Sequence, residues 1–399
     1  MSGAAGTPAA RRPAATRLAE AVYDSHEATR WFMQHVREVV PTAHVTPGGA
    51  EVWALPQAPR DLDAVRVRGG DGRSWELREM LAATHTDGVL VLSHGEVVYE
   101  RYFDGMTDGT QHLYQSVSKS VGACVAARLI EQGFFTPDTP LTAVVPELAG
   151  SGYDGATVQH LLDMQVGVRF DEVYEDDDSE IARLDRLYGF RPRRAADEPG
   201  SSYAFATETE RGGPHGHVMH YVSLDLQVLG WVMERAAGAT VPELIARELW
   251  CGLGGEHEAY IALDAAGAAQ LEGGFCSSLR DLGRFGLLLC RGGEGPAGRL
   301  LPEAFVADSE RNGDRDAYAR AGITGEECVP DPAYRNNFWT ASFDGHHVLM
   351  GVGIFGQYLY VDRAAQFVLA KFSTWPRFSD DQLYTHQFCA AHSLAELLG

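Results

Sequence analysis

The chain has 399 residues, of which 45% are hydrophobic and 22% are charged, and its formal net charge is −22. This composition is typical of a soluble globular protein, and the length allows roughly two to three domains or one large fold with an insertion. The excess of 55 acidic over 33 basic residues argues against a nucleic-acid-binding protein, because phosphate backbones are bound by clustered lysine and arginine. The same balance argues against binding to an anionic membrane surface.

The six cysteines are scattered singly, without a Cys-x-x-Cys pair: Cys124, Cys251, Cys276, Cys290, Cys328 and Cys389. They predict reduced thiols in a cytoplasmic protein. Residues 1–15 are rich in Ala, Gly and Pro and lack the apolar core of a signal peptide, so we expect residues 1–30 to form a disordered tail. No apolar run approaches the ~18 residues that a membrane span needs.

The first predicted elements are a β-hairpin and a helix. Strands at 89–92 and 97–99 flank a turn that contains Gly95. From residue 116 the apolar residues change to helical spacing, and Gly133 is placed to end that helix.

The middle of the chain is predicted to be mostly helix and loop. A short helix is expected at 157–164, and a longer one at 224–237 that Gly238 closes. A capping-box pattern at 240–243 opens the next helix, which ends near residue 251.

Strand patterns return at 349–354, 357–361 and 367–372, and an amphipathic helix closes the chain. This order predicts an α+β fold, in which one antiparallel sheet is built from both chain ends and flanked by helices. We expect residues 31–115 and 232–399 to form the sheet domain, and residues 116–231 an inserted, mainly helical domain with the active site at the junction.

The most informative string is Ser116-Val117-Ser118-Lys119, at the predicted start of a helix. Residues three apart lie on one helical face, so the Lys119 amine can reach the Ser116 hydroxyl and take its proton. A helix N-terminus also favours a developing negative charge. By itself the pattern is common, and an N-cap serine followed by a solvated lysine is the alternative interpretation.

A second candidate is Tyr221, which with Ser223 precedes the predicted helix at 224–237. A serine hydrolase needs a group that gives a proton to the leaving group, and a tyrosine phenol beside a lysine can do so. The alternative is a packed tyrosine, with Ser223 as the helix N-cap.

A third candidate is the stretch 351–356, Gly-Val-Gly-Ile-Phe-Gly, which matches G-x-G-x-x-G. A strand and not a helix is predicted to follow, so the dinucleotide-binding interpretation fails. Glycines in a strand allow a ligand to approach closely. We therefore expect this strand to line an acyl site and to donate a backbone N–H to an oxyanion.

Three motifs thus occur in order: Ser116-x-x-Lys119, Tyr221-x-Ser223 and Gly351-x-Gly353. Together they resemble the S-x-x-K, Y-x-N/S and K-T-G motifs of the serine β-lactamase and penicillin-recognising superfamily. The string at 116–120 and the stretch 145–165 are more closely similar to the 6-aminohexanoate-dimer hydrolases, amidases of nylon oligomers with a class C β-lactamase-like fold. The resemblance covers roughly residues 30–395 and implies an α/β sandwich of the serine β-lactamase type.

The resemblance implies a role for each matching residue. Ser116 would be the acylated nucleophile and Lys119 its proton acceptor. Tyr221 would protonate the leaving amine and help activate the hydrolytic water. The backbone N–H groups of Ser116 and Ile354 would form the oxyanion hole. The implied substrate-binding residues are Tyr174, Asp185, Ser223, Glu272, Trp339 and Phe355. Asp185 could hold a substrate ammonium group.

Three positions depart from the family patterns. Gly351 stands in place of the Lys of K-T-G, so the cation that binds a β-lactam carboxylate is missing. Glu272 stands where the amidase has Asn, and Phe355 where it has His. These differences leave the acyl-transfer chemistry intact and put the nylon-dimer substrate in doubt.

Several other clusters are set aside. The acidic run 171–180 does not fit a calcium loop and is interpreted as a solvated flap. The histidines at 215–220 and 346–347 lack the spacing of a zinc site, so no metal is expected. The arginines at 183–194 are expected to pair with the acidic run and not with nucleic acid.

We therefore expect a cytoplasmic serine hydrolase, without cofactor, that forms an acyl-enzyme with linear amides of small amino acids. Asp185 and Glu272 favour a substrate with a free amine. A carboxylesterase or acyltransferase of the same fold is the first alternative, and a catalytically silent binding protein is the second. β-Lactamase and peptidoglycan peptidase activities are disfavoured by Gly351. A homodimer is one alternative for the oligomeric state.

Overall fold

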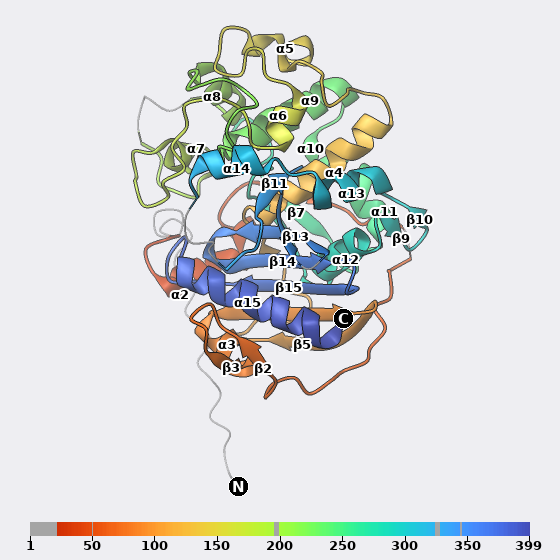
Figure 1. Ribbon diagram of the computed structural model, residues 1–399. Coiled ribbons are helices and arrows are strands. Elements are labelled where there is room, and N and C mark those ends of the chain that lie inside the picture. The colour runs from red at the N-terminus through yellow and green to blue at the C-terminus, as the bar shows by residue number, and fades with distance from the viewer. Residues whose placement is uncertain (1–21, 50, 195–198, 324–327, 344) are drawn as a thin grey trace.

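The computed structural model describes residues 22–49, 51–194, 199–323, 328–343 and 345–399 (Figure 1). Most of the predicted tail, residues 1–21, lies outside the described residues. Its last part does not fit a tail, because Val22 is buried and helix α2 (His26–Met33) begins inside the predicted range. The Ser25 side chain caps that helix by accepting from the backbone N–H of Ala28.

The main sheet has seven antiparallel strands in the order β11-β12-β13-β14-β15-β4-β5. Their bounds are β4 (Thr86–Ser93), β5 (Glu96–Tyr102), β11 (Ala333–Arg335), β12 (Phe338–Phe343), β13 (His346–Gly353), β14 (Gln357–Asp362) and β15 (Phe367–Ser373). β15 pairs with β4, with Leu369 opposite Val91, so the two chain ends meet inside one sheet. The predicted antiparallel sheet built from both ends is confirmed.

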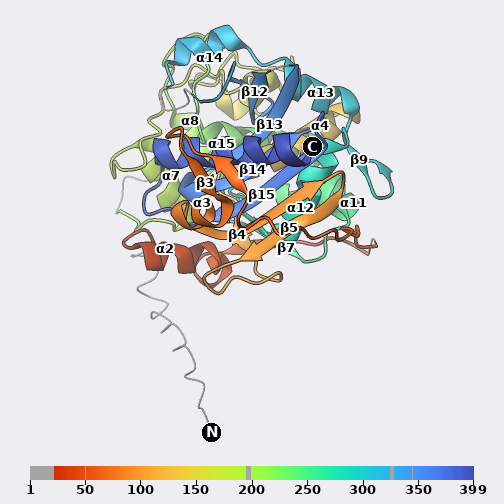
Figure 2. The ribbon, with the colours of Figure 1, turned by 60° about the horizontal axis from the view of Figure 1, so that its bottom comes forward.

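Helices cover both faces of this sheet. α15 (Asp381–Leu398) and α3 (Leu77–Ala83) lie on one face, as Figures 1 and 2 both show, and α12 (Leu279–Cys290) packs on the other. Strand β4 is buried throughout because alternate side chains enter different cores. Leu90 and Leu92 join the core that contains α12, and Val91 joins the core that contains α15. The α+β prediction is confirmed.

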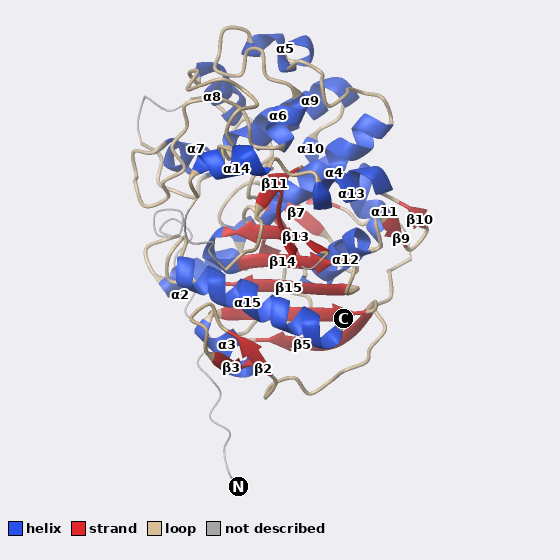
Figure 3. Cartoon of the chain, viewed as in Figure 1, coloured by secondary structure: helices blue, strands red, loops and turns tan. Residues whose placement is uncertain are grey.

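A mainly helical region lies beside the sheet, at the top of the view in Figure 3. Its elements are α4 (Val117–Glu131), α5 (Leu141–Val144), η2 (Pro146–Leu148), α6 (Val158–Leu162), α7 (Glu180–Tyr188), α8 (Ser202–Glu208) and α9 (Leu224–Ala237). The chain continues through α10 (Val241–Ile245), the π-helical turn η3 (Ala246–Trp250) and α11 (Cys251–Leu253). α9 runs without interruption through the predicted boundary at 231/232, so any division of the chain lies outside this helix.

The remaining elements are small. A four-stranded sheet has the order β1-β7-β8-β6, with β1 (Thr42–Val45), β6 (His112–Leu113), β7 (Ala259–Ala262) and β8 (Phe275–Ser277). Two-stranded ribbons pair β2 (Arg66–Arg68) with β3 (Ser74–Glu76) and β9 (Glu294–Gly295) with β10 (Gly298–Arg299). Also present are η1 (Val36–Glu38), α13 (Glu303–Arg311), α14 (Arg315–Ala321) and η4 (Ile354–Gly356). Within the described ranges, no helix is long and apolar enough to cross a membrane.

Candidate active site

Ser116 lies in a tight turn between β6 and α4. The preceding residue, Gln115, has a φ of 48°, in the left-handed region, and Ser116 is the N-cap of α4. The backbone N–H of Tyr114 donates to the carbonyl of Phe275, and the N–H of Phe275 donates to the Ser118 hydroxyl. Strand β8 therefore holds the turn on both sides and places Ser116 at the positive end of a 15-residue helix.

The Lys119 side chain is buried and its Nζ contacts three oxygen atoms. The distances are 3.0 Å to the Ser116 Oγ, 3.1 Å to the Ser223 Oγ and 2.9 Å to the backbone oxygen of Glu272. A neutral amine has two N–H donors, which the oxygens of Ser223 and Glu272 can accept, and one lone pair, which is then left for the Ser116 hydroxyl. This is the geometry of a base that takes the Ser116 proton.

Tyr221 packs against this lysine. The Lys119 Nζ lies 4.9 Å from the centroid of the Tyr221 ring, so it contacts the π face. The ring also stacks on Trp339, with centroids 5.6 Å apart and an angle of 22° between the planes. The contacts with Lys119 and Trp339 hold the Tyr221 ring in place beside the lysine. The proton-transfer role of its phenol stays a prediction.

Glu172 is part of the site, although sequence reasoning grouped it with a solvated acidic run. Its carboxylate accepts the Ser223 hydroxyl at 2.5 Å and the Ser223 backbone N–H at 3.0 Å. It also accepts the Tyr174 hydroxyl at 2.7 Å. Ser223 therefore accepts from Lys119 and donates to Glu172, which links a carboxylate to the lysine through one hydroxyl. No spacing in the sequence distinguishes Glu172 from its acidic neighbours, because only the fold of the 171–180 segment turns it inward.

Gly353 brings the end of β13 against the turn that carries Ser116. A Cβ atom at this position would lie 2.8 Å from the backbone oxygen of Tyr114 and 3.1 Å from the Gln115 Cβ. Glycine thus allows the two backbones to approach, and Ile354 follows directly. This close approach explains the glycine pattern without a dinucleotide.

Ser116 opens onto a cavity of about 180 Å³. The cavity is lined by Ser116, Tyr174, Tyr221, Trp339, Val352, Gly353, Ile354, Trp375, Phe378, Ser379, Asp380, Asp381 and Tyr384. The predicted contact residues Tyr174 and Trp339 are in this lining, and so are Ser116 and Ile354, whose backbone N–H groups are predicted to bind the oxyanion. Four of the lining residues come from the segment that joins β15 to α15, and Asp381 and Tyr384 come from the start of α15. None of these six was predicted from the sequence.

Asp185 is on α7, buried and paired with an arginine. Its Oδ2 lies 3.1 Å from the Arg191 Nε, and Arg191 also donates to the Asp177 carboxylate and to the Tyr174 carbonyl. Burial raises the pKa of Asp185 to about 6, although Arg191 acts in the opposite direction. Asp185 is not among the residues that line the cavity, and its carboxylate already has a cation partner.

Glu272 is buried beneath Lys119. Its backbone oxygen accepts from the Lys119 amine, whereas its side-chain Oε2 is buried without a hydrogen-bond partner among the described residues. Burial raises the pKa of Glu272 to about 8, against the opposing effect of Lys119. The carboxyl group is therefore neutral at pH 7 and does not line the cavity.

Phe355 and Ser223 also lie behind the cavity wall. The Phe355 ring is buried between Tyr23 and Phe378, with centroids 5.4 Å and 4.9 Å away. Phe378 in turn lines the cavity, so Phe355 shapes it from one layer away. Ser223 is likewise buried, and it reaches the site through Lys119.

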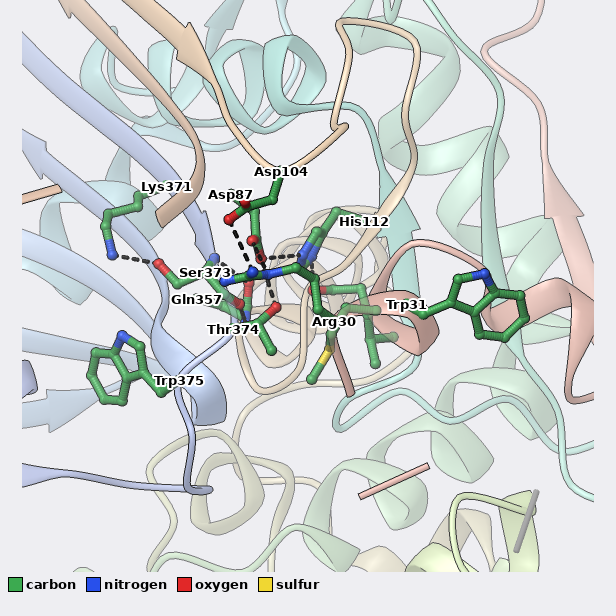
Figure 4. Close-up of polar contacts among 12 residues, drawn as sticks. Arg30, Trp31, Asp87, Asp104, His112, Gln357, Lys371, Ser373, Thr374 and Trp375 are labelled. Carbon is green, nitrogen blue, oxygen red and sulfur yellow. Dashed lines mark hydrogen bonds and ion pairs between the residues drawn. The ribbon is translucent and has the colours of Figure 1, made fainter. Parts of the chain in front are cut away.

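A buried polar cluster holds the loop that carries Trp375 (Figure 4). The Thr374 hydroxyl donates to the Asp87 carboxylate at 2.6 Å, and Arg30 pairs with the other oxygen of Asp87 at 2.9 Å. The Trp375 indole N–H donates to the backbone oxygen of Thr84 at 3.0 Å. Asp87 in β4 and Thr84 just before it therefore position one aromatic wall of the cavity.

The clusters set aside from the sequence have structural partners. His220 contacts the carbonyl of Phe170, and His346 lies 3.1 Å from the Asp362 carboxylate. Arg194 pairs with the Asp178 carboxylate of the acidic run, as expected. Within the part of the chain that the structure describes, no three His, Cys, Asp or Glu side chains converge as a metal site.

Comparison with known proteins decides the family. The family model described as Beta-lactamase matches residues 77–391, a range that includes Ser116, Lys119, Tyr221 and Ile354. The chain belongs to the beta-lactamase family. This membership fits the antiparallel sheet, the helical region beside it and the serine at the junction of the two.

Individual relatives within the beta-lactamase family are also similar. A 6-aminohexanoate-dimer hydrolase from Paenarthrobacter ureafaciens is 35% identical over 347 residues, which are 87% of this chain and 86% of that protein. A solved structure from Bacillus anthracis, named as a candidate 6-aminohexanoate-dimer hydrolase, has a TM-score of 0.84 at 25% identity and covers 97% of this chain and 98% of its own. EstCE1, a hydrolase with promiscuous acyltransferase activity, shares the fold with a TM-score of 0.59 at 17% identity, over 78% of this chain and 98% of its own.

Proposed function

We propose that this protein is a serine hydrolase that acts through an acyl-enzyme on linear amides of small amino acids. The observation that carries the proposal is the contact of the buried Lys119 amine with the Ser116 hydroxyl at 3.0 Å, inside the cavity wall. The 35% identity to a 6-aminohexanoate-dimer hydrolase over most of both chains supports the choice of substrate class.

In the proposed acylation, the neutral Lys119 amine takes the proton of Ser116 while the Oγ attacks the amide carbonyl. The carbonyl becomes an oxyanion, which the backbone N–H groups of Ser116 and Ile354 would bind. The N-terminus of α4 adds favourable potential at the same point. Expulsion of the amine needs a proton, which the Tyr221 phenol supplies at the cavity wall.

In deacylation, the Tyr221 phenolate takes a proton from water as the water oxygen attacks the ester carbon of the acyl-enzyme. The bond from that carbon to the Ser116 Oγ breaks, and the Oγ regains its proton. Lys119 returns that proton, because the oxygens of Ser223 and Glu272 keep its amine in place during the cycle. The Glu172 carboxylate stabilises the positive charge that Lys119 carries between the two steps, through the Ser223 hydroxyl.

The proposal is tested with single and double variants. Ser116→Ala and Lys119→Ala should each abolish nearly all turnover, and the double variant should be little worse, because the two residues act as one unit. A fluorophosphonate probe should label the native chain and not Ser116→Ala. Additive losses, or a folded native chain that the probe does not label, would contradict the mechanism.

A carboxylesterase or acyltransferase is the second candidate, because the same Ser116, Lys119 and Tyr221 would act on an ester and could pass the acyl group to an alcohol. The observation that favours it is the aromatic lining of the cavity, which excludes water around the acyl group. Hydrolysis of p-nitrophenyl esters compared with linear amides, with and without an added alcohol, separates the two. A β-lactam in the same panel should remain intact, since Gly351 supplies no cation for its carboxylate.

Two finer expectations complete the proposal. Within the described residues, no disulfide joins any of the cysteines, which supports a reducing compartment such as the cytoplasm. Size-exclusion chromatography with light scattering would test whether the chain forms a homodimer.

A further inference from the structure

Two cysteine side chains from distant parts of the chain meet on the sheet face that α15 covers. Cys389 is on α15, and Cys328 lies in the segment that leads into β11. The Cys328 thiol hydrogen-bonds to the Cys389 sulfur, and both side chains pack against the core that contains Tyr358. Burial raises the pKa of Tyr358, and both thiols lie close enough to its hydroxyl to add to that effect.

Cys389 is the more reactive type of thiol. The hydrogen bond from Cys328 lowers its pKa, and Arg68 acts in the same direction, against the effect of burial. A lower pKa leaves more of the thiolate, which is the nucleophilic form of cysteine. By contrast, burial raises the pKa of Cys124 and of Cys276, which makes those thiols inert.

Both thiols of the pair are accessible and both are carried by anchored backbone. Cys328 and Cys389 are half-buried, so a small solute can reach them. The Cys389 carbonyl accepts the Ser393 hydroxyl at 2.8 Å, inside α15. On the other side, the Pro330 carbonyl accepts the backbone N–H of Ser342 in β12 at 3.0 Å. The fold therefore keeps the two sulfur atoms facing each other.

Only a small movement separates this contact from a covalent bond. A hydrogen bond between two thiols already brings the sulfur atoms together, and an S–S bond of about 2 Å needs a further approach of the same two atoms. The backbone at 328–331 forms turns and bends and not a regular strand, so it can supply that movement.

We infer that Cys328 and Cys389 are a redox-sensitive pair that forms a reversible disulfide when a small-molecule disulfide, such as glutathione disulfide, is present as oxidant. A half-buried disulfide of this kind is open to reduction by small thiols, which makes the bond reversible. Disulfides are rare in the cytoplasm, and those that form there are usually transient and redox-sensing.

The reaction has two exchange steps. The Cys389 thiol loses its proton to solvent, and the thiolate attacks one sulfur of the oxidant, whose S–S bond breaks. One small thiolate leaves and takes up a proton. The Cys328 thiol then gives its proton to solvent, and its sulfur attacks the Cys389 sulfur. The mixed disulfide breaks, and the second small thiolate leaves and takes up a proton. Two protein thiols are thus oxidised to one disulfide, and one small disulfide is reduced to two thiols.

The bond would tie together two elements that supply the wall of the Ser116 cavity. Trp339 comes from β12, which holds the segment after Cys328, and Tyr384 comes from α15. The closed loop would run from residue 328 to residue 389, and a cross-link over a loop of this length restricts the unfolded chain strongly. The oxidised form should therefore be the more stable one.

The test uses the purified full-length chain and does not depend on the proposed hydrolase activity. The native protein is treated with glutathione disulfide at mildly alkaline pH, and its intact mass and peptide map are recorded. It should lose the mass of two hydrogen atoms, and the peptide of Cys328 should be linked to that of Cys389. Dithiothreitol should restore the starting mass. Cys251→Ser is the matched control, because it removes another half-buried thiol and should form the same bond.

Single variants separate the two thiols. Cys328→Ser should stop at the mixed disulfide of Cys389 with glutathione. Cys389→Ser should lose the fast phase of mixed-disulfide formation that Cys328→Ser retains. After removal of the oxidant, the oxidised native chain should have a Tm about 3–5 °C above that of the reduced chain. Cys328→Ser should show no such rise, and its Tm in dithiothreitol shows that it is folded.

Four results would overturn the inference. They are the absence of the linked peptide from the oxidised native chain, a bond between other cysteines or between two copies of the chain, a bond that forms only after unfolding in urea, and equal Tm values for the oxidised and reduced native chain. The peptide map and the Tm of the native chain decide the question even where a variant does not fold.

Discussion

Glu272 is expected to make the stability of this protein fall as the pH rises. Its carboxyl group is buried beneath Lys119, with one oxygen unpartnered, and its pKa is raised from 4.5 to about 8. Between these values the unfolded chain has lost the proton and the folded chain still holds it. The folded state therefore binds more protons, and the free energy of unfolding decreases with rising pH across this window.

The size of the effect follows from the shift. One pKa unit corresponds to about 1.4 kcal/mol, so the interval from 4.5 to about 8 corresponds to about 5 kcal/mol once the pH exceeds 8. Most of this loss, about 3 kcal/mol, is already present at pH 7. Both values are a substantial fraction of the total stability of about 5–15 kcal/mol that is usual for a folded protein.

Glu272→Gln tests this reasoning because the amide keeps the shape of the neutral carboxyl and cannot ionise. The backbone oxygen that accepts from Lys119 is retained. The variant and the native chain should have similar stability near pH 5, and the variant should gain about 1.4 kcal/mol per pH unit towards pH 8. The gain is measured by urea unfolding, followed by tryptophan fluorescence, at each pH unit from 5 to 9.

The difference between variants isolates Glu272 from other groups that titrate. Asp185, whose pKa is raised to about 6, faces Glu272 and is present in both proteins. The exposed Glu175→Gln serves as the control, and its difference from the native chain should be flat with pH. A flat difference for Glu272→Gln, or a native chain that is the more stable at pH 8, would refute the reasoning.

Three further outcomes are expected. Glu172→Gln should lower kcat about 10- to 100-fold in a steady-state assay. Hydrogen bonds to a charged acceptor contribute about 1.5–3 kcal/mol, and the amide cannot accept from all three donors. An unchanged kcat would show that Glu172 has no role in the site. Gly353→Ala should destabilise the chain by about 1–3 kcal/mol in thermal unfolding and reduce turnover, since its Cβ would lie 2.8 Å from the Tyr114 carbonyl oxygen. Gly49→Ala is the control, because a Cβ at Gly49 would meet open space. Equal effects of the two substitutions would contradict the close-approach argument. Lys371 is buried, and burial lowers its pKa to about 7. Between pH 7 and 10 only the unfolded chain holds this proton, so the stability of the native chain should rise with pH in urea unfolding. Lys371→Met should lack this rise, and a pH profile identical to that of the native chain would show that Lys371 does not titrate in this range.

The sequence was sufficient for the elements whose patterns are local. The hairpin appears as β4 and β5, with His94 and Gly95 both at positive φ in the turn. The helix at 224–237 ends at Gly238 in the left-handed region, as predicted. Such signals work because periodicity and capping depend on residues only a few positions apart.

The contacts of the charged residues could not be predicted in the same way. Glu172 and Glu175 belong to one acidic run, yet the first accepts two hydrogen bonds from Ser223 and the second is exposed. Asp185 pairs with Arg191, a contact that the sequence did not predict, and its role in binding a substrate stays a prediction. A carboxylate's partner depends on which distant segment folds against it, and the sequence pattern around the carboxylate does not contain that information.

The sequence alone determined the order of the motifs, the antiparallel sheet from both chain ends, and the serine and lysine on one turn of a helix. Those features follow from residue type and short-range spacing. Only the tertiary structure decided that the Ser223 hydroxyl and the Glu272 carbonyl accept hydrogen bonds from the Lys119 amine. It also decided that Asp380 and Asp381 lie in the wall of the Ser116 cavity. These residues are far apart in the chain. They meet because apolar surface is buried when the β15–α15 segment and the helical region pack against the sheet, and that packing is not encoded in any short stretch of sequence.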